Sequence, residues 1–224
     1  MSSVESFFDR GQAELRAGEI HVDGPPGAGG PRFGISAVLR PEGEIVDRLT
    51  ELGRQAAAIA GGGHWVHDGR MLHTTLRCLE AHSARDLDGD ARLARYAAAL
   101  DEAAAATPAI ELELRGLAAH KGGVMAMGHD SSEAFPRLRK IYVDALDARG
   151  VEHYERSFTR DLWYLSLLHF GAPVPDPAAL ADWAASRRDQ RIGSVVYRSV
   201  QICGWRLVDG SMIARILHEA KLSG

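Results

Sequence analysis

The residues of this chain best suited to chemistry lie in the stretch 71–79, where polar side chains alternate with apolar ones. Its β-branched and apolar content is typical of a strand, and strand side chains alternate between two faces. Strict alternation predicts His73, Thr75 and Arg77 on one face and Leu72, Leu76 and Cys78 near the other. An imidazole can move a proton, a hydroxyl can hold a phosphate oxygen and a guanidinium can balance its charge. The stretch therefore suits a phosphate ligand, and a structural histidine in a strand is the alternative.

A second stretch, 162–170, repeats this arrangement of polar and apolar residues. Alternation places Tyr164 and Ser166 on one face and His169 on the other. A single β-bulge between Ser166 and His169 would reverse the alternation and bring the His169 ring to the face of Tyr164. His169 is thus either a ligand-binding residue or a partly buried histidine at a strand end.

The elements that must position these stretches follow from hydrophobic periodicity and from turn residues. We expect helices at 4–17, 44–60, 90–106, 132–148 and 176–188, and strands at 33–39, 71–79, 110–117, 123–128, 162–170, 194–203, 205–208 and 211–218, the last two forming a hairpin around 209–210. The loop 24–31 is rich in proline and glycine and lacks the G-K-S/T end of a phosphate-binding loop. Residues 1–31 are therefore expected to be a helix and a linker, and residues 32–218 an α/β domain of two similar lobes.

The composition limits the class of protein. With 224 residues, 46% of them hydrophobic, the chain can bury a substantial core. The net charge of -4 argues against tight, sequence-independent binding to duplex nucleic acid and leaves a small phosphorylated ligand open. No apolar run approaches the roughly 20 residues of a membrane span, and the acidic start lacks the features of a signal peptide. We expect a cytoplasmic protein that does not bind membranes; the sequence does not predict its oligomeric state.

The cysteines and the other histidines do not predict a metal site. Cys78 and Cys203 lie in separate predicted strands, as expected for buried thiols of a reduced protein, although a disulfide stays open. His64 and His67 fall on opposite faces of a strand, so they lack ligand spacing together with His73. We expect them to be exposed in a turn or an edge strand, and we expect no metal and no cofactor.

The arrangement of the two stretches resembles the two-histidine phosphoesterase superfamily, which includes the RNA 2',3'-cyclic phosphodiesterases also called 2'-5' RNA ligases. In that family two lobes each present an H-x-T/S-hydrophobic strand to a central cleft. The tetrad His73-Thr74-Thr75-Leu76 matches the first motif, and Tyr164 of the second stretch lies 91 residues after His73. The resemblance covers about residues 32–218. It implies a bilobal fold and metal-free hydrolysis by one histidine that takes a proton from water and another that gives one to the leaving ribose oxygen.

The second motif departs from the family, because Tyr164-Leu165-Ser166-Leu167 stands where H-x-S/T is expected. A tyrosine with an ordinary pKa near 10 can donate a proton or a hydrogen bond but is a poor base at neutral pH. The resemblance then implies that His73 and Tyr164 are catalytic and that Thr75, Ser166, Arg77 and His169 bind the substrate, a phosphodiester or cyclic phosphate of a nucleotide, RNA end or related metabolite. Two alternatives stay open: a nucleotide or RNA-end binding module without turnover, and a site recruited to a non-hydrolytic reaction.

Overall fold

The computed structural model describes residues 3–23, 34–81, 91–155, 161–208 and 211–224. In chain order its elements are α1 (Ser3–Arg16), β1 (Ile35–Leu39), α2 (Glu44–Ala60), β2 (Trp65–Val66), β3 (Thr74–Glu80), α3 (Ala91–Ala105), β4 (Ile110–His120), β5 (Gly123–His129), α4 (Ala134–Ala148), β6 (Trp163–His169), α5 (Pro177–Ala185), β7 (Arg191–Tyr197), β8 (Ser199–Val208) and β9 (Ser211–Lys221). None of the helices in these ranges is long and apolar enough to cross a membrane. The expected loop at 24–31 and the expected turn at 209–210 lie outside the described residues.

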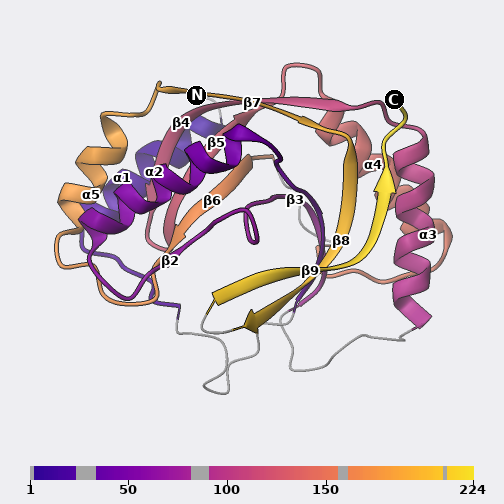
Figure 1. Cartoon of the computed structure of the whole chain (residues 1–224), viewed down its shortest axis with the longest axis horizontal. Helices are drawn as coiled ribbons and strands as arrows, with labels where there is room; N and C mark the ends of the chain where they lie inside the picture. The colour runs from indigo at the N-terminus through magenta and orange to yellow at the C-terminus, as the bar shows by residue number, and fades with distance from the viewer. Residues whose placement is uncertain (1–2, 24–33, 82–90, 156–160, 209–210) are drawn as a thin grey trace.

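The strands form a curled sheet in the order β7-β4-β5-β6-β3-β1-β8-β9, and β2 pairs with β6 (Figure 1). Each pairing between these strands is antiparallel. The sheet has two parts, which we call the first lobe (β2, β4, β5, β6 and β7) and the second lobe (β1, β3, β8 and β9). The two parts are joined within the sheet by the pairing of Thr74 on β3 with Leu165 on β6. The predicted bilobal α/β fold is confirmed.

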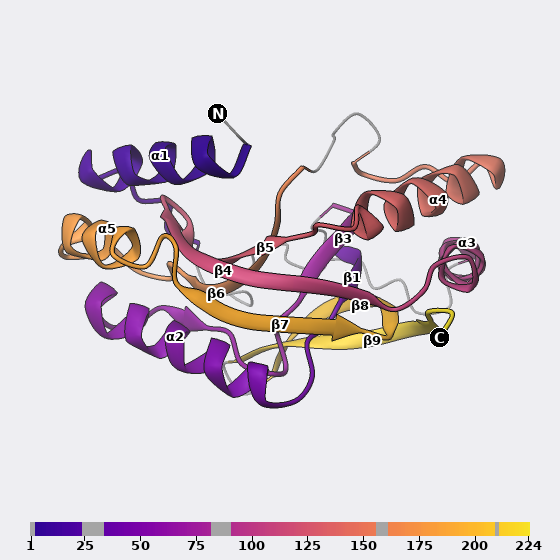
Figure 2. The same ribbon diagram turned by 90° about the horizontal axis from the view of Figure 1, so that it is seen from above.

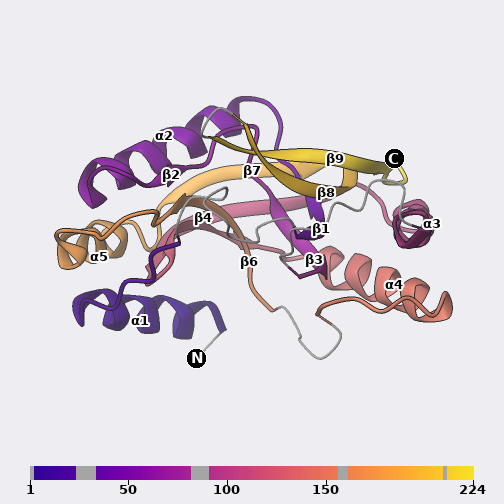
Figure 3. The same cartoon turned by 90° about the horizontal axis from the view of Figure 1, so that it is seen from below.

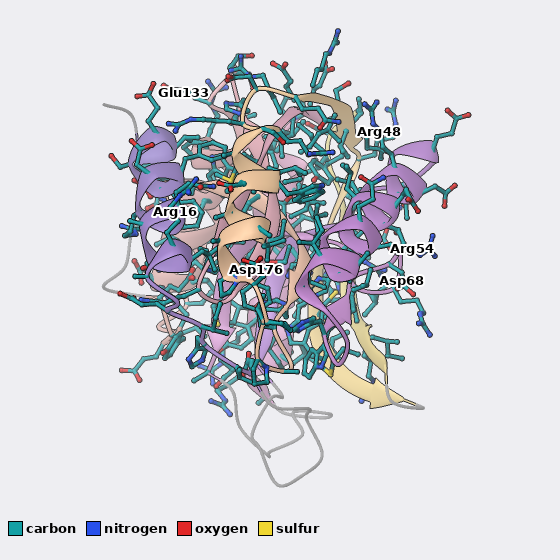
Figure 4. The ribbon with its side chains drawn as sticks, turned by 90° about the vertical axis from the view of Figure 1, so that its left-hand side faces the viewer. Arg16, Arg48, Arg54, Asp68, Glu133 and Asp176 are labelled. Atoms are coloured by element: carbon teal, nitrogen blue, oxygen red, sulfur yellow. The ribbon has the colours of Figure 1, made fainter. Side chains whose placement is uncertain are left out.

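Helices gather around each lobe at opposite ends of the molecule. The first lobe packs against α1, α2 and α5, and the second against α3 and α4 (Figures 2 and 3). Figure 4 looks onto the end where α1, α5 and α2 stand side by side, with Arg16 on α1 and Arg54 on α2. The N-terminal helix belongs to this layer, because Gln12 donates to the Ala181 carbonyl oxygen at 2.7 Å and Phe8 is buried.

The helix α2 has the predicted bounds, Glu44–Ala60, because its apolar residues recur at helical spacing and glycines flank it. Gly61, directly after the helix, has a φ of 97°, a left-handed conformation that favours glycine. The helix α5 begins at Pro177 with Asp176 as its cap, whose side chain accepts from the Ala179 N–H at 2.9 Å. It ends at Ala185, three residues before the predicted end.

The strand predicted at 194–203 is wrong as a single element, because it is divided between β7 and β8 at Arg198. The strand β7 pairs with β4 at an edge of the first lobe, whereas β8 pairs with β1 and β9 in the second. No glycine or proline marks this break. The strand ends because its pairing partner changes, and a local sequence pattern does not report pairing partners.

Candidate functional site

The two motif stretches lie side by side where the lobes meet. The residue pair Thr74–Leu165 sets an antiparallel register. That register places His73 opposite Ser166 and Thr75 opposite Tyr164, on the face away from the buried Thr74 and Leu165. The two stretches therefore present an imidazole, a phenol and two aliphatic hydroxyls to the same region.

A cavity of about 350 Å³ opens on this face. Its described lining consists of Asp23, Ser36, Trp65, His67, Met71, His73, Thr75, Cys78, Tyr164, Ser166, His169, Trp205 and Met212. The two tryptophans and two methionines supply apolar wall, and the histidines and hydroxyls supply polar groups. Five of the six residues singled out from the sequence line the cavity; the sixth, Arg77, does not.

His169 reaches the cavity through a β-bulge in β6. Ser166 pairs with Met125 and Leu168 pairs with Val124, so Leu167 is one extra residue with no partner on β5. Both Leu167 and Leu168 are buried, and the alternation is reversed beyond them. Strict alternation is therefore wrong for His169, and the alternative of a bulge between Ser166 and His169 describes the strand.

A matching bulge in β3 turns Arg77 away from the cavity. Thr75 pairs with Val38 and Arg77 with Ala37, so Leu76 is the extra residue. The expectation that Arg77 shares a face with Thr75 is wrong, because the bulge reverses the alternation and brings Cys78 into the cavity instead.

Arg77 is held behind β3 by hydrogen bonds to the segment 151–155. The residue is 5% exposed, Nη2 donates to the carbonyl oxygen of Glu155 at 2.6 Å, and Nη2 also lies 3.0 Å from Nδ1 of His153. Burial lowers the pKa of the guanidinium from its ordinary value. The Glu155 carboxylate in turn accepts from the Cys78 N–H at 3.0 Å. In this geometry Arg77 fastens a neighbouring segment to β3.

His73 precedes β3 and is oriented by its own chain. Its Nδ1 lies 2.6 Å from the carbonyl oxygen of Met71. A carbonyl only accepts, so Nδ1 carries the proton and donates, and Nε2 of the neutral ring has a lone pair. The ring also packs on Trp205, with 4.5 Å between ring centroids. His73 is therefore held as a potential proton acceptor at Nε2.

His67 is a site residue that the sequence did not predict. The side chain was expected to be exposed, but the residue is 2% exposed and its Nε2 lies 2.8 Å from Nδ1 of His169. Burial, and then the nearby His169 and His73, hold the pKa of His67 well below its ordinary value, so its ring is neutral at physiological pH. The sequence signal that points to His67 is weak: it lies in a possible edge strand shortly before the stretch 71–79.

The remaining histidine of that segment lies apart from the cavity. His64 bonds through Nε2 to the Ala60 carbonyl oxygen at 2.9 Å and packs on Phe170. Within the described ranges, no group of three or more histidine, cysteine, aspartate or glutamate side chains is arranged to hold a metal ion. The two cysteines there form no disulfide: Cys203 is buried, which raises its pKa to about 12, and Cys78 is half-buried.

Several solved structures share this architecture. TT0787 of Thermus thermophilus aligns with a TM-score of 0.63 at 16% identity over 85% of this chain and 98% of its own. E. coli LigT complexed with 3'-AMP aligns with a TM-score of 0.55 at 12% identity over 86% and 99%, and a phosphoesterase aligns with 0.56 at 14% identity over 86% and 99%. No protein-family model and no curated protein sequence matches the chain. Identities this low carry information on the fold alone.

Proposed function

Since the chain has the bilobal two-histidine phosphoesterase fold, we propose that it is a phosphodiesterase that hydrolyses a cyclic phosphate or phosphodiester of a nucleotide, RNA end or related metabolite. The observation that carries this proposal is that His73 and His169 line the same cavity. The position of the second motif histidine is taken by Tyr164, and the bulge at Leu167 supplies an imidazole from three residues beyond the motif serine. The site thus retains two rings able to move protons.

The proposed reaction needs no metal. Nε2 of His73 takes a proton from water while the water oxygen forms a bond to phosphorus. The bond from phosphorus to the leaving ribose oxygen breaks, and that oxygen takes a proton from His169 in its cationic form. Each such group typically contributes about 10² to 10⁴ in rate. The assignment of His73 as the base follows from the Met71 carbonyl, which fixes the His73 proton on Nδ1 and makes Nε2 the accepting nitrogen.

The hydroxyl groups would bind the phosphate. Thr75 and Ser166 are half-buried on facing strands and can each donate to a non-bridging oxygen. Tyr164 can donate a third hydrogen bond from its phenol. These donors would stabilise charge that develops on the phosphate oxygens in the transition state.

The apolar part of the cavity would hold a base or a similar flat group. Trp65 and Trp205 line it, and aromatic faces stack on nucleobases. E. coli LigT, which shares the fold, has been crystallised with 3'-AMP, ATP and NADP+. By analogy, we propose a small phosphorylated ligand or an RNA end as the partner of this chain.

A second candidate is a binding module without turnover. It is favoured by Tyr164 itself, because a phenol replaces the proton-moving group that the motif carries. A site recruited to a non-hydrolytic reaction, with Tyr164 as the acid, is the third.

The deciding experiment is to incubate the purified chain with 2',3'-cyclic nucleotides and to follow turnover and binding together. Turnover that His73→Ala and His169→Ala both abolish supports the phosphodiesterase. Binding without turnover rejects it in favour of the binding module. A lack of both rejects these two functions and leaves the recruited site.

A further inference from the structure

The segment that carries His67 holds the bulged end of β6. Its strand β2 pairs with β6, with Trp65 opposite His169 and Val66 opposite Leu168. The next backbone group, the N–H of His67, donates to the carbonyl oxygen of Leu167 at 2.9 Å. His67 is therefore bonded to the very residue whose insertion brings His169 to the cavity.

The His67 side chain makes a second contact with the same strand end. Its Nε2 lies 2.8 Å from Nδ1 of His169, and the ring centroids are 4.8 Å apart. One nitrogen of such a pair must donate and the other accept. Since His67 is buried and His169 is only half-buried, an additional proton on the pair resides on His169. A cationic ring bears hydrogen on both nitrogens, so Nδ1 of His169 then donates and Nε2 of His67 accepts.

The two proposed catalytic rings are thus held in the same way. Nδ1 of His73 is bonded to the Met71 carbonyl, and Nδ1 of His169 is bonded to His67. In both rings Nε2 is the nitrogen that this bond does not engage. This similarity is the ground for giving His67 a role in the reaction as well as in the fold.

We propose that His67 is the positioning residue of His169: it holds Nδ1, directs Nε2 to the ligand and accepts the Nδ1 hydrogen when His169 is the acid. The catalytic role of His67 rests on the phosphodiesterase proposed above. Its effect on the protonation of His169, through the bond to Nδ1, does not depend on that function. The other described titratable groups that line the cavity around the pair are Asp23, His73, Cys78 and Tyr164. His67 acts only through His169 and does not touch the reacting atoms.

The test follows the ring nitrogens of both histidines by NMR as the pH is changed, in the complete chain. In the wild type we expect His169 to take up a proton while His67 stays neutral. His67→Phe removes the acceptor and keeps a flat ring, so the pKa of His169 should fall by about one unit, a tenfold change in its acid dissociation constant. His67→Gln places an amide oxygen near the position of Nε2 and should restore part of this shift.

Kinetics with a 2',3'-cyclic nucleotide supply the second measurement. We expect kcat of His67→Phe to fall about tenfold with KM within about twofold, and His67→Gln to recover part of the loss. His64→Gln is the matched control, because it removes a half-buried histidine of the same segment that contacts Ala60 and Phe170 instead. It should leave the His169 titration and kcat unchanged.

The outcomes separate this inference from the proposed function. A folded His67→Phe variant with the titration and kcat of the wild type would overturn the inference. Should that variant fail to fold, the wild-type spectra decide alone, since a His67 ring that is protonated before His169 also overturns it. If the wild type shows no turnover, the phosphodiesterase fails, and the NMR titration still tests whether His67 controls His169.

Discussion

Cys78 and His169 occupy equivalent places in the two motif strands. Each lies three residues after the motif hydroxyl, Thr75 or Ser166, and each reaches the cavity because the next residue after that hydroxyl is a bulge. The two halves of the site are therefore alike in backbone and different in chemistry. One half has its imidazole at the start of the motif, and the other has it five residues further along the strand.

From this arrangement we expect His73 and His169 to work as a pair. His73→Ala and His169→Ala should each lower kcat for a 2',3'-cyclic nucleotide about 10²- to 10⁴-fold, because each removes a proton-moving group. The fold-decrease in kcat of the double variant should be much smaller than the product of the two single fold-decreases, because the effects of residues that act together are not additive. Initial rates of the three variants measure this, with His129→Ala, a half-buried histidine of β5 that does not line the cavity, as the control. Full activity in either single variant would contradict the pairing.

Tyr164 is expected to bind the phosphate. Tyr164→Phe keeps the ring and removes the hydroxyl, and the loss of a hydrogen bond to a charged group, roughly 1.5–3 kcal/mol, corresponds to about a tenfold or larger fall in binding or turnover. Calorimetry with a nucleotide and initial rates measure the two effects. Unchanged values in a variant with the circular dichroism of the wild type would place Tyr164 outside the site.

The replacement Tyr164→His tests the origin of the second motif. If the tyrosine stands in for a lost histidine, the new imidazole faces Thr75 across the strands and should raise hydrolysis of a 2',3'-cyclic nucleotide. If the tyrosine serves another reaction, the variant should lose its native activity and gain no phosphodiesterase activity. The comparison with Tyr164→Phe distinguishes a gained imidazole from a lost phenol.

Gly123 on β5 is expected to be required for the path of β6. Its φ is 154°, and a Cβ atom there would lie 2.0 Å from the carbonyl oxygen of Leu168. Gly123→Ala should therefore lower the free energy of unfolding by about 2 kcal/mol or more and displace the strand end that carries His169. Urea unfolding measures the loss. Gly204→Ala is the control, because a Cβ there finds its nearest neighbour at 3.6 Å; an equal loss in both variants would refute the steric explanation.

The stability of the fold should decrease in mild acid, in part through His120. Burial lowers its pKa to about 4, and its Nδ1 accepts from the Gly122 N–H at 3.2 Å, a bond that protonation removes. Between about pH 6.5 and 4 the unfolded chain therefore binds a proton that the folded chain does not, so stability is full above this window and falls as the pH falls through it.

His120→Asn tests this pH dependence, since its side-chain oxygen can still accept from Gly122 and does not titrate. The variant should lose less stability than the wild type from pH 7 to 4, by on the order of 1–3 kcal/mol. Urea midpoints over this range measure the difference, and His129→Asn controls for the removal of a histidine. The buried His67 should retain part of the acid sensitivity in every variant. Parallel pH curves for wild type and His120→Asn would exclude this residue as a cause.

The periodicity of single segments predicted much of the fold. The sequence pattern predicts the helix Glu44–Ala60 with its observed bounds, because burial of one helix face leaves a local pattern. The bulges at Leu76 and Leu167 leave no such pattern, since a bulge is a mismatch with a partner strand. For this reason alternation predicts the wrong face for Arg77 and leaves two alternatives open for His169. The division of 194–203 at Arg198 was missed for the same reason.

His67 was missed because its environment depends on the whole fold. Its neighbours in sequence, Trp65 and Asp68, indicate an edge segment, and a histidine in such a segment is usually exposed. It is buried because it meets His169, which lies 102 residues away in the chain. The chemistry of the first motif could be deduced from residue types, whereas the second half of the site depends on contacts between distant segments.

The order of the elements has a consequence for the integrity of the site. The chain passes repeatedly between the lobes, so that β1 and β3 come before β4–β7 while β8 and β9 come after them. A cut of the chain anywhere between β3 and β8 divides the strands of the second lobe between the two fragments, so neither fragment contains that lobe complete. A cut between β5 and β6 also separates His73 from His169. Neither lobe can be produced as a contiguous piece. Two fragments divided there can restore the cavity only by assembling with each other.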